Sequence, residues 1–137
     1  MKKTFTLIEI LVVATIIALL AGGGVTVYTQ LNKNARNSKR KADIEQIRSA
    51  LEMYRSDNNY YYSGVGSFNN NCSSVNWLTQ YINEIPTDPK SNYYYRCNIS
   101  ANDYTIGVYL EETTSTCSIG SCGDTNCNYC LGPYGKK

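Results

Sequence analysis

The chain has 137 residues and a formal net charge of +2, which is too small to indicate nucleic acid as the main partner. It contains no histidine, which excludes the usual acid–base, proton-shuttle and histidine–metal sites. The length allows one small domain plus an appended element, and the aromatic residues are 13 tyrosines, two phenylalanines and one tryptophan on a mostly polar chain.

The first predicted element is an apolar segment at residues 5–27, which follows the basic residues Lys2 and Lys3. As a helix it would be about 35 Å long, enough to cross a bilayer. Its one acid, Glu9, would cost about 2.5–3.5 kcal/mol at the centre of a membrane helix, so the carboxylate requires a partner or a position near water. A membrane anchor and a secretory signal peptide cut after Gly23 both stay open from the residues alone.

A second, amphipathic half continues the helical pattern beyond this segment. One apolar stripe recurs at helical spacing through Ile44, Ile47, Leu51 and Tyr54. Oppositely charged residues stand three or four positions apart on the rest of this half and support an exposed helix. We therefore expect one helix from Thr6 to about Ser56, ended by the turn-forming residues 57–59.

Three consecutive glycines interrupt the apolar half at Gly22, Gly23 and Gly24. Each glycine costs a helix about 1 kcal/mol relative to alanine. Together the three invite a bend or local melting of the helix at this depth.

The part of the chain after the helix predicts a small sheet. A short helix is expected where Asn76 caps a run ended by Pro86 and Pro89. Its buried face would consist of Trp77, Leu78, Tyr81 and Ile82. Strands are expected at 93–97 and 104–110, joined by a loop at 98–103. Since so small a sheet cannot stand alone, we expect an α+β fold with the antiparallel sheet packed on the C-terminal half of the long helix.

Cysteines are confined to the last part of the chain and are dense enough to indicate a disulfide scaffold. The candidates are Cys72, Cys97, Cys117, Cys122, Cys127 and Cys130. We expect two or three disulfides that pin a C-terminal tail at residues 113–137, with a pairing that the sequence does not choose. The alternative is a four-thiolate zinc site formed by Cys117, Cys122, Cys127 and Cys130, in which one pair alone has the tight two-residue spacing.

The run Phe5-Thr6-Leu7-Ile8-Glu9, after a short basic leader and before about 20 apolar residues, resembles the class III signal and N-terminal helix of type IV pilins and type II secretion pseudopilins. The stretches at 39–61, 77–89 and 104–112 resemble short pseudopilin-like pilins. The likeness therefore covers residues 1 to about 112.

The resemblance implies a role for each part of the N-terminal helix. A prepilin peptidase would cut between Thr4 and Phe5 and methylate the new amine of Phe5. Glu9 would pair with the N-terminal amine of a neighbouring subunit and set the axial stagger of a filament. The glycine triplet would loosen in the packed filament. The implied parts are a leader at 1–4, a hydrophobic anchor and filament core at 5–31, an amphipathic half at 32–57 and a globular head at 58–137.

The implied function is structural, without catalysis: a subunit held in the inner membrane as a prepilin, processed, and polymerised into an extracellular type IV pilus or pseudopilus filament on the cell surface. No phosphate loop or paired-carboxylate motif indicates an enzyme. The implied partners are copies of the same chain, a prepilin peptidase, an assembly ATPase and a platform protein.

Other functions stay open beside this one. The clusters Tyr60-Tyr61-Tyr62 and Tyr93-Tyr94-Tyr95 allow adhesion or base stacking, although tyrosine is also an ordinary strand and interface residue. The basic cluster at 33–41 is the candidate DNA track for a role in DNA uptake, against a helix face paired with Asp43 and Glu45. A secreted disulfide-rich module cut after Gly23 is the third possibility.

Two positions depart from the pattern of the resembled family. The family usually has a glycine where this chain has Thr4. Major pseudopilins of type II secretion carry a C-terminal calcium loop, which residues 113–137 do not match. Asp124, Asn126 and Asn128 alternate like oxygen ligands but lack a downstream glutamate, so no cofactor is expected and calcium is a minor alternative.

Overall fold

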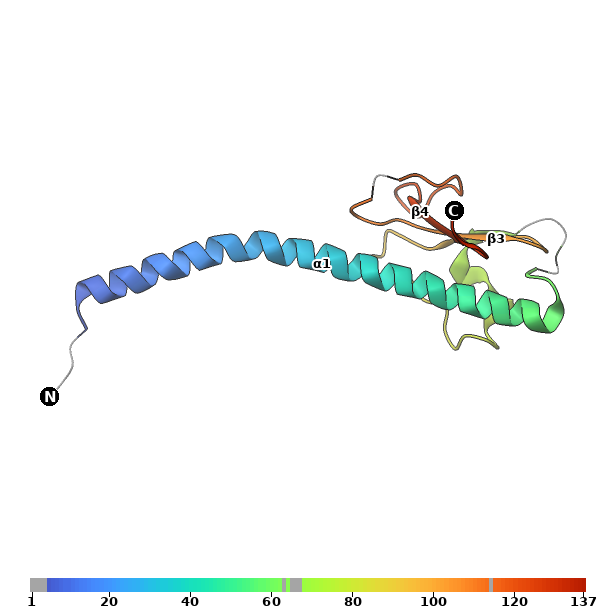
Figure 1. Cartoon of the computed structure of the whole chain (residues 1–137), viewed down its shortest axis with the longest axis horizontal. Helices are drawn as coiled ribbons and strands as arrows, with labels where there is room; N and C mark the ends of the chain where they lie inside the picture. The colour runs from blue at the N-terminus through green and yellow to red at the C-terminus, as the bar shows by residue number, and fades with distance from the viewer. Residues whose placement is uncertain (1–4, 63, 65–67, 114) are drawn as a thin grey trace. The chain divides into compact units, whose positions relative to one another are not determined.

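A computed structural model describes residues 5–62, 64, 68–113 and 115–137, apart from the side chain of Thr26 (Figure 1). The predicted leader at 1–4, which includes Thr4, lies outside the described residues. The chain divides into two compact units, Met1–Ala35 and Arg36–Lys137, which are described separately below.

The long helix α1 spans Leu7–Asn58, so the predicted single helix is confirmed. Its last backbone hydrogen bond joins the Asn59 amide to the Arg55 carbonyl oxygen at 2.7 Å. Asn59 then takes a positive φ of 67°, a conformation that asparagine tolerates better than most residues and that turns the chain out of the helix. Gly22, Gly23 and Gly24 are helical in this structure.

The first unit contains the apolar half of α1. Its described apolar side chains are exposed, for example Leu7 at 82% and Leu19 at 78%. Among the described residues, α1 is the one helix whose length and composition suit a membrane span. An apolar surface on all sides of a helix requires lipid or protein around it.

The second unit contains a five-stranded antiparallel sheet in the order β1-β2-β3-β4-β5. Its strands are β1 Phe68–Asn71, β2 Arg96–Ile99, β3 Tyr104–Val108, β4 Tyr129–Gly132 and β5 Gly135–Lys136. Strands that neighbour each other in the sheet also follow each other in the chain. In the central pairs Ile106 lies opposite Cys97 of β2 and opposite Leu131 of β4.

The main core lies between the second half of α1 and one face of this sheet. Ile44, Ile47 and Leu51 of the helix are at most 1% exposed. They belong to one buried cluster with Ile106 and Val108 of β3. The predicted packing of the sheet on the C-terminal half of the helix is therefore confirmed.

Two predicted elements have different bounds in the structure. The residues near Trp77 form a short 3₁₀ helix, Asn76–Leu78, which follows another, Cys72–Ser74. Val75 occupies the N-cap position of the second one, so Asn76 lies inside the helix and does not cap it.

The strands are also shifted from their predicted bounds. The first begins at Arg96 because Tyr93 bridges to Gly123 instead, and it continues to Ile99, which pairs with both Phe68 and Tyr104. The second ends at Val108. The backbone amide and carbonyl of Leu110 bond the side chain of Asn128 and leave the ladder there.

Candidate functional site

The N-terminal turn of α1 contains the acid that the sequence analysis singled out. The Glu9 carboxylate oxygen Oε2 accepts hydrogen bonds from the Thr6 amide at 2.9 Å and from the Thr6 hydroxyl at 2.8 Å. The Glu9 amide in turn donates to the Thr6 hydroxyl oxygen at 3.4 Å. This reciprocal pattern is a capping box, which satisfies amides that the first helical turn leaves without partners.

Glu9 therefore has a partner within its own chain, which the sequence analysis did not consider. The S/T-x-x-E spacing of Thr6 and Glu9 is the signal that would have revealed it. Next to this turn, Phe5, Ile8, Glu9, Val12 and Val13 line an open, mostly apolar hollow. The carboxylate thus lies at the rim of an apolar surface.

The glycine triplet is not required by packing within one chain. At Gly22, Gly23 and Gly24 no heavy atom lies within 4 Å of the place that a Cβ atom would take. The predicted loosening of this segment concerns the assembled state and stays a prediction.

A buried ion cluster joins distant segments of the second unit. Arg40 of α1 is 0% exposed. Its guanidinium group forms a two-pronged pair with Asp88, Nε to Oδ2 at 2.7 Å and Nη2 to Oδ1 at 2.9 Å. Nη1 donates to Glu111 Oε1 at 3.0 Å. Burial by itself would lower the pKa of Arg40, but the hydrogen bonds with Asp88 and Glu111 raise it above its ordinary value, so the group stays charged.

Glu111 is the most heavily paired acid of the cluster. Arg36 donates from Nε and Nη2 to its two carboxylate oxygens, at 2.6 and 2.7 Å. Lys90 Nζ lies 3.1 Å from Oε2. The hydrogen bonds from Arg36, and then those from Lys90, lower the pKa of Glu111 to about 2. The cluster therefore ties the segment after β3 and the loop that contains Asp88 to one face of α1.

The predicted pairing of the basic cluster at 33–41 is wrong for its two arginines. Asp43 accepts a hydrogen bond from the Tyr95 hydroxyl at 2.6 Å, and Glu45 pairs with Arg48 at 3.3 Å. The acids that hold Arg36 and Arg40 lie 48 to 75 positions away in the chain. No local spacing rule could have found them.

Tyrosine hydroxyls bond the remaining acids of the helix face. Glu52 accepts from Tyr104 at 2.8 Å and from Tyr61 at 3.1 Å. Burial raises the pKa of both Tyr95 and Tyr104. The hydrogen bond that each hydroxyl donates, to Asp43 and to Glu52 respectively, raises it further. The tyrosine clusters thus contribute largely to packing, and the ring of Tyr93 also stacks on that of Tyr109 with centroids 5.0 Å apart.

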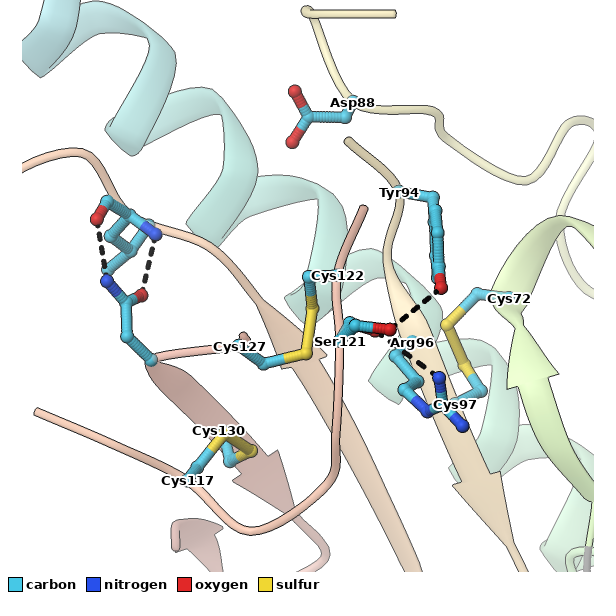
Figure 2. Close-up of a disulfide and its surroundings, with 12 residues drawn as sticks. Cys72, Asp88, Tyr94, Arg96, Cys97, Cys117, Ser121, Cys122, Cys127 and Cys130 are labelled. Atoms are coloured by element: carbon cyan, nitrogen blue, oxygen red, sulfur yellow. Dashed lines mark hydrogen bonds between the residues drawn. A yellow bond between two sulfur atoms is a disulfide. The ribbon is translucent and has the colours of Figure 1, made fainter. Parts of the chain in front are cut away.

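All six cysteines are paired in disulfides, as expected (Figure 2). The pairs are Cys72–Cys97, Cys117–Cys130 and Cys122–Cys127. The zinc alternative is therefore wrong, because its four thiols form two of these bonds. Among the described residues no group of three or more Cys, Asp or Glu side chains is arranged to hold a metal ion.

Comparison with known families decides the identity of this helix and head. Residues 27–116 match the family described as type II secretion system (T2SS), protein G. The chain belongs to the type II secretion protein G family. The resemblance to pseudopilins is thereby confirmed, and the chain is a pilin-like structural subunit and not an enzyme.

Relatives of this protein G family member come from several bacteria. The chain is 36% identical over 101 residues to the type II secretion system core protein G of Pseudomonas aeruginosa PAO1, over 68% of this chain and 71% of the relative. It is 32% identical over 105 residues to that of Escherichia coli K12, over 71% of this chain and 72% of the relative. No solved structure matches the chain significantly.

Proposed function

We propose that this protein G family member is a pseudopilin that is held in the inner membrane as a prepilin and polymerises through its N-terminal helix into a filament of a secretion apparatus. The exposed apolar half of α1 carries this proposal, since its side chains have no core of their own within the first unit. Lipid before assembly, and helices of other subunits after it, would cover this surface.

The proposed processing step gives Glu9 a second partner. A cut between Thr4 and Phe5 would leave a charged amine on Phe5. Phe5 and Glu9 both line the apolar hollow. A carboxylate offers about four acceptor sites, and Thr6 uses one oxygen of Glu9. The amine of a neighbouring subunit can therefore bind Glu9 while the capping box persists. Such a pair between charges in apolar surroundings would fix the register of the subunits.

The DNA-uptake alternative gains no support from the basic cluster. Arg36 and Arg40 donate to Glu111 and Asp88, so these two guanidinium groups are not available to phosphate groups. We infer that the cluster stabilises the head. A role in adhesion has no specific observation in its favour among the described residues.

The intact mass and N-terminal sequence of the protein from its native cells test the proposal. Membranes and sheared filament material should be analysed side by side. The expected chain starts at Phe5, carries one methyl group on its amine and occurs in the sheared fraction. A chain that starts at Gly24, or an uncut chain confined to membranes, would contradict the proposal.

A further inference from the structure

The C-terminal lobe, residues 115–130, occupies the part of the chain where the resembled pseudopilins carry a calcium loop. Asn128 is one of the candidate oxygen ligands, but it is 8% exposed and both ends of its side-chain amide are hydrogen-bonded. Its Oδ1 accepts from the Leu110 amide at 2.7 Å. Its Nδ2 donates to the carbonyl oxygens of Leu110 and Thr113 at 2.7 and 3.0 Å. The Asn128 side chain is therefore held against the backbone of Leu110 and Thr113, and its oxygen already binds the amide at which β3 ends.

The acids near the lobe are also engaged. Asp124 Oδ2 accepts from Asn92 Nδ2 at 2.9 Å. The residue before it, Gly123, has a φ of 107°. Its backbone lies so near that of Asn92 that a Cβ atom there would collide with the Asn92 carbonyl oxygen. Glu111 holds Arg36, Arg40 and Lys90. A calcium site needs six to eight converging oxygens, and the described residues of the lobe do not fit one.

Disulfide sulfur atoms form the interior of the lobe instead. Ile119, Cys122, Cys127 and Cys130 make a second buried cluster, separate from the main core. This cluster covers β3 at Gly107, where a Cβ atom would lie 2.5 Å from Ile119 Cγ2 and 3.0 Å from Cys127 Sγ. Figure 2 shows the Cys122–Cys127 and Cys117–Cys130 bonds, and Cys130 of the second bond belongs to β4.

The backbone of the lobe folds around these two bonds. The Cys127 amide donates to the Gly120 carbonyl at 2.9 Å, and the Cys122 amide to the Thr125 carbonyl at 2.8 Å. The Ser115 hydroxyl donates to the Asn128 carbonyl at 2.7 Å. Before β4 the described part of the lobe contains no helix or strand, and isolated bridges such as Tyr93–Gly123 and single hydrogen bonds such as that from the Tyr94 amide to the Cys122 carbonyl join it to the head.

We propose that thiol oxidation, and not a bound calcium ion, fixes the C-terminal lobe of this protein. Each of the two disulfides of the lobe forms when a pair of cysteine thiols gives two electrons and two protons to the disulfide of a dithiol oxidant. One S–S bond forms in the lobe, one breaks in the oxidant, and the oxidant leaves as two thiols. The implied partner is a thiol-oxidising protein outside the cytoplasm, where such bonds persist.

The first experiment compares calcium and reductant on the full chain in mild detergent. Hydrogen exchange followed by mass spectrometry would report the amide protection of residues 115–130. We expect the same protection and the same Tm in excess EGTA and in about 10 mM CaCl₂, which lies above the Kd of the weakest extracellular calcium modules. We expect reduction by a phosphine to abolish protection of the lobe, and oxidised glutathione to restore it.

Three variants separate the effect of the disulfides from the effect of calcium. The pair Cys122→Ser/Cys127→Ser should lose lobe protection with or without calcium. The matched control Cys72→Ser/Cys97→Ser should lose protection near β1 and β2 while the lobe stays protected. Asp124→Asn keeps an acceptor for Asn92 and removes the charge that calcium would need, so it should behave like the unmodified chain.

A rise in the Tm of the oxidised chain with calcium, or recovery of the reduced lobe by calcium alone, would overturn the proposal. Retention of full lobe protection after reduction would overturn it as well. These readouts do not depend on filament formation, so they are independent of the proposed function. If Cys122→Ser/Cys127→Ser fails to fold, the calcium titration of the oxidised chain still decides.

Discussion

Arg40 shows how a single buried residue can organise the head. Its guanidinium group contacts Asp88, Glu111 and the Asn37 side chain and is closed off from solvent. The Tyr93 ring also lies 5.6 Å from it, in cation–π geometry. Loss of its acidic partners would leave the buried cation unpaired, and loss of the arginine would leave a buried acid unpaired. Either change strongly destabilises the fold.

Replacement of Arg40 by alanine should lower the free energy of unfolding by about 3–5 kcal/mol, because Asp88 would stay buried without its cation and Glu111 would lose one of its three. Urea unfolding of the full chain in mild detergent, followed by near-ultraviolet circular dichroism, measures this. The exposed neighbour Lys39 serves as control, and its change to alanine should cost no more than about 0.5 kcal/mol. Equal effects of the two changes would contradict the role of Arg40.

Glu111 makes the stability of the head depend on pH in acid. Its pKa is about 2 in the folded chain against an ordinary value of 4.5, so the carboxylate stabilises the fold fully above pH 4.5. This contribution is lost as pH falls from 4.5 toward 2. The difference in unfolding free energy between the unmodified chain and Glu111→Gln should therefore be largest at neutral pH and close across this interval.

Unfolding curves collected in steps from neutral pH to pH 2 would measure that difference. Glu45→Gln is the control, since the Glu45 side chain is 53% exposed. A difference between the unmodified chain and Glu111→Gln that stays constant with pH would contradict the assigned role of Glu111.

At the scale of elements, β3 is covered on both faces. Its Ile106 and Val108 side chains enter the main core under α1. Its other face at Gly107 is covered by Ile119 and Cys127 of the C-terminal lobe. β3 therefore lies between the main core and the C-terminal lobe, and it is also the middle strand of the sheet.

Gly107→Ala should destabilise the head by about 1–3 kcal/mol, because the added methyl group would overpack this contact. In an Ile119→Ala background the same change should cost less, since the nearest atom has been removed. Thermal unfolding of the four chains gives the coupling energy. Strict additivity would mean that Gly107 does not contact the lobe in solution.

The glycine triplet of α1 gives a second prediction at this scale. Gly22→Ala/Gly24→Ala should stabilise the helix by about 1 kcal/mol per site, since nothing occupies the added space. Hydrogen exchange of this segment should slow. If the filament requires a loosened helix, the yield of sheared filaments should fall as well. Ala18→Gly is the matched control and should speed up the exchange.

The sequence predicted elements better than their ends. Helical periodicity predicted α1 to within two residues at each end, and a strand was expected where β3 lies. It could not place the end of β3, which depends on a side chain 18 positions from Leu110. The strands β1, β4 and β5 were not anticipated, because they are short and rich in asparagine and glycine, which disfavour strands.

At the scale of the whole molecule, the chain joins a unit without a core of its own to a unit with two. The first unit is an apolar helical segment, and the second is held by a buried cluster, ion pairs and disulfides. Sequence alone predicted this division of roles, because charge and cysteine are absent from most of the apolar segment. It could not predict the ion cluster, whose partners meet only through the fold.

Glu9→Gln tests the assembly role in the complete chain. The amide can still accept from Thr6, but its bond to a neighbour's amine would lose charge assistance, so the yield of filaments should fall about tenfold or more. Membrane insertion should not fall. Thr6→Val is the matched control, since it removes the hydroxyl cap and leaves the charge of Glu9 in place. Equal loss of filaments in both variants would favour capping over amine pairing.

The contact at Gly107 also links the residues that can occur in β3 to those that can occur in the C-terminal lobe. A side chain at this site would compete for space first with Ile119 Cγ2 and then with the sulfur atom of Cys127. Family members that lack both the Cys122–Cys127 pair and a large side chain equivalent to Ile119 should therefore tolerate alanine or serine at the position equivalent to 107. Those that keep the pair should keep the glycine, so an alignment of such sequences would show the two sites changing together.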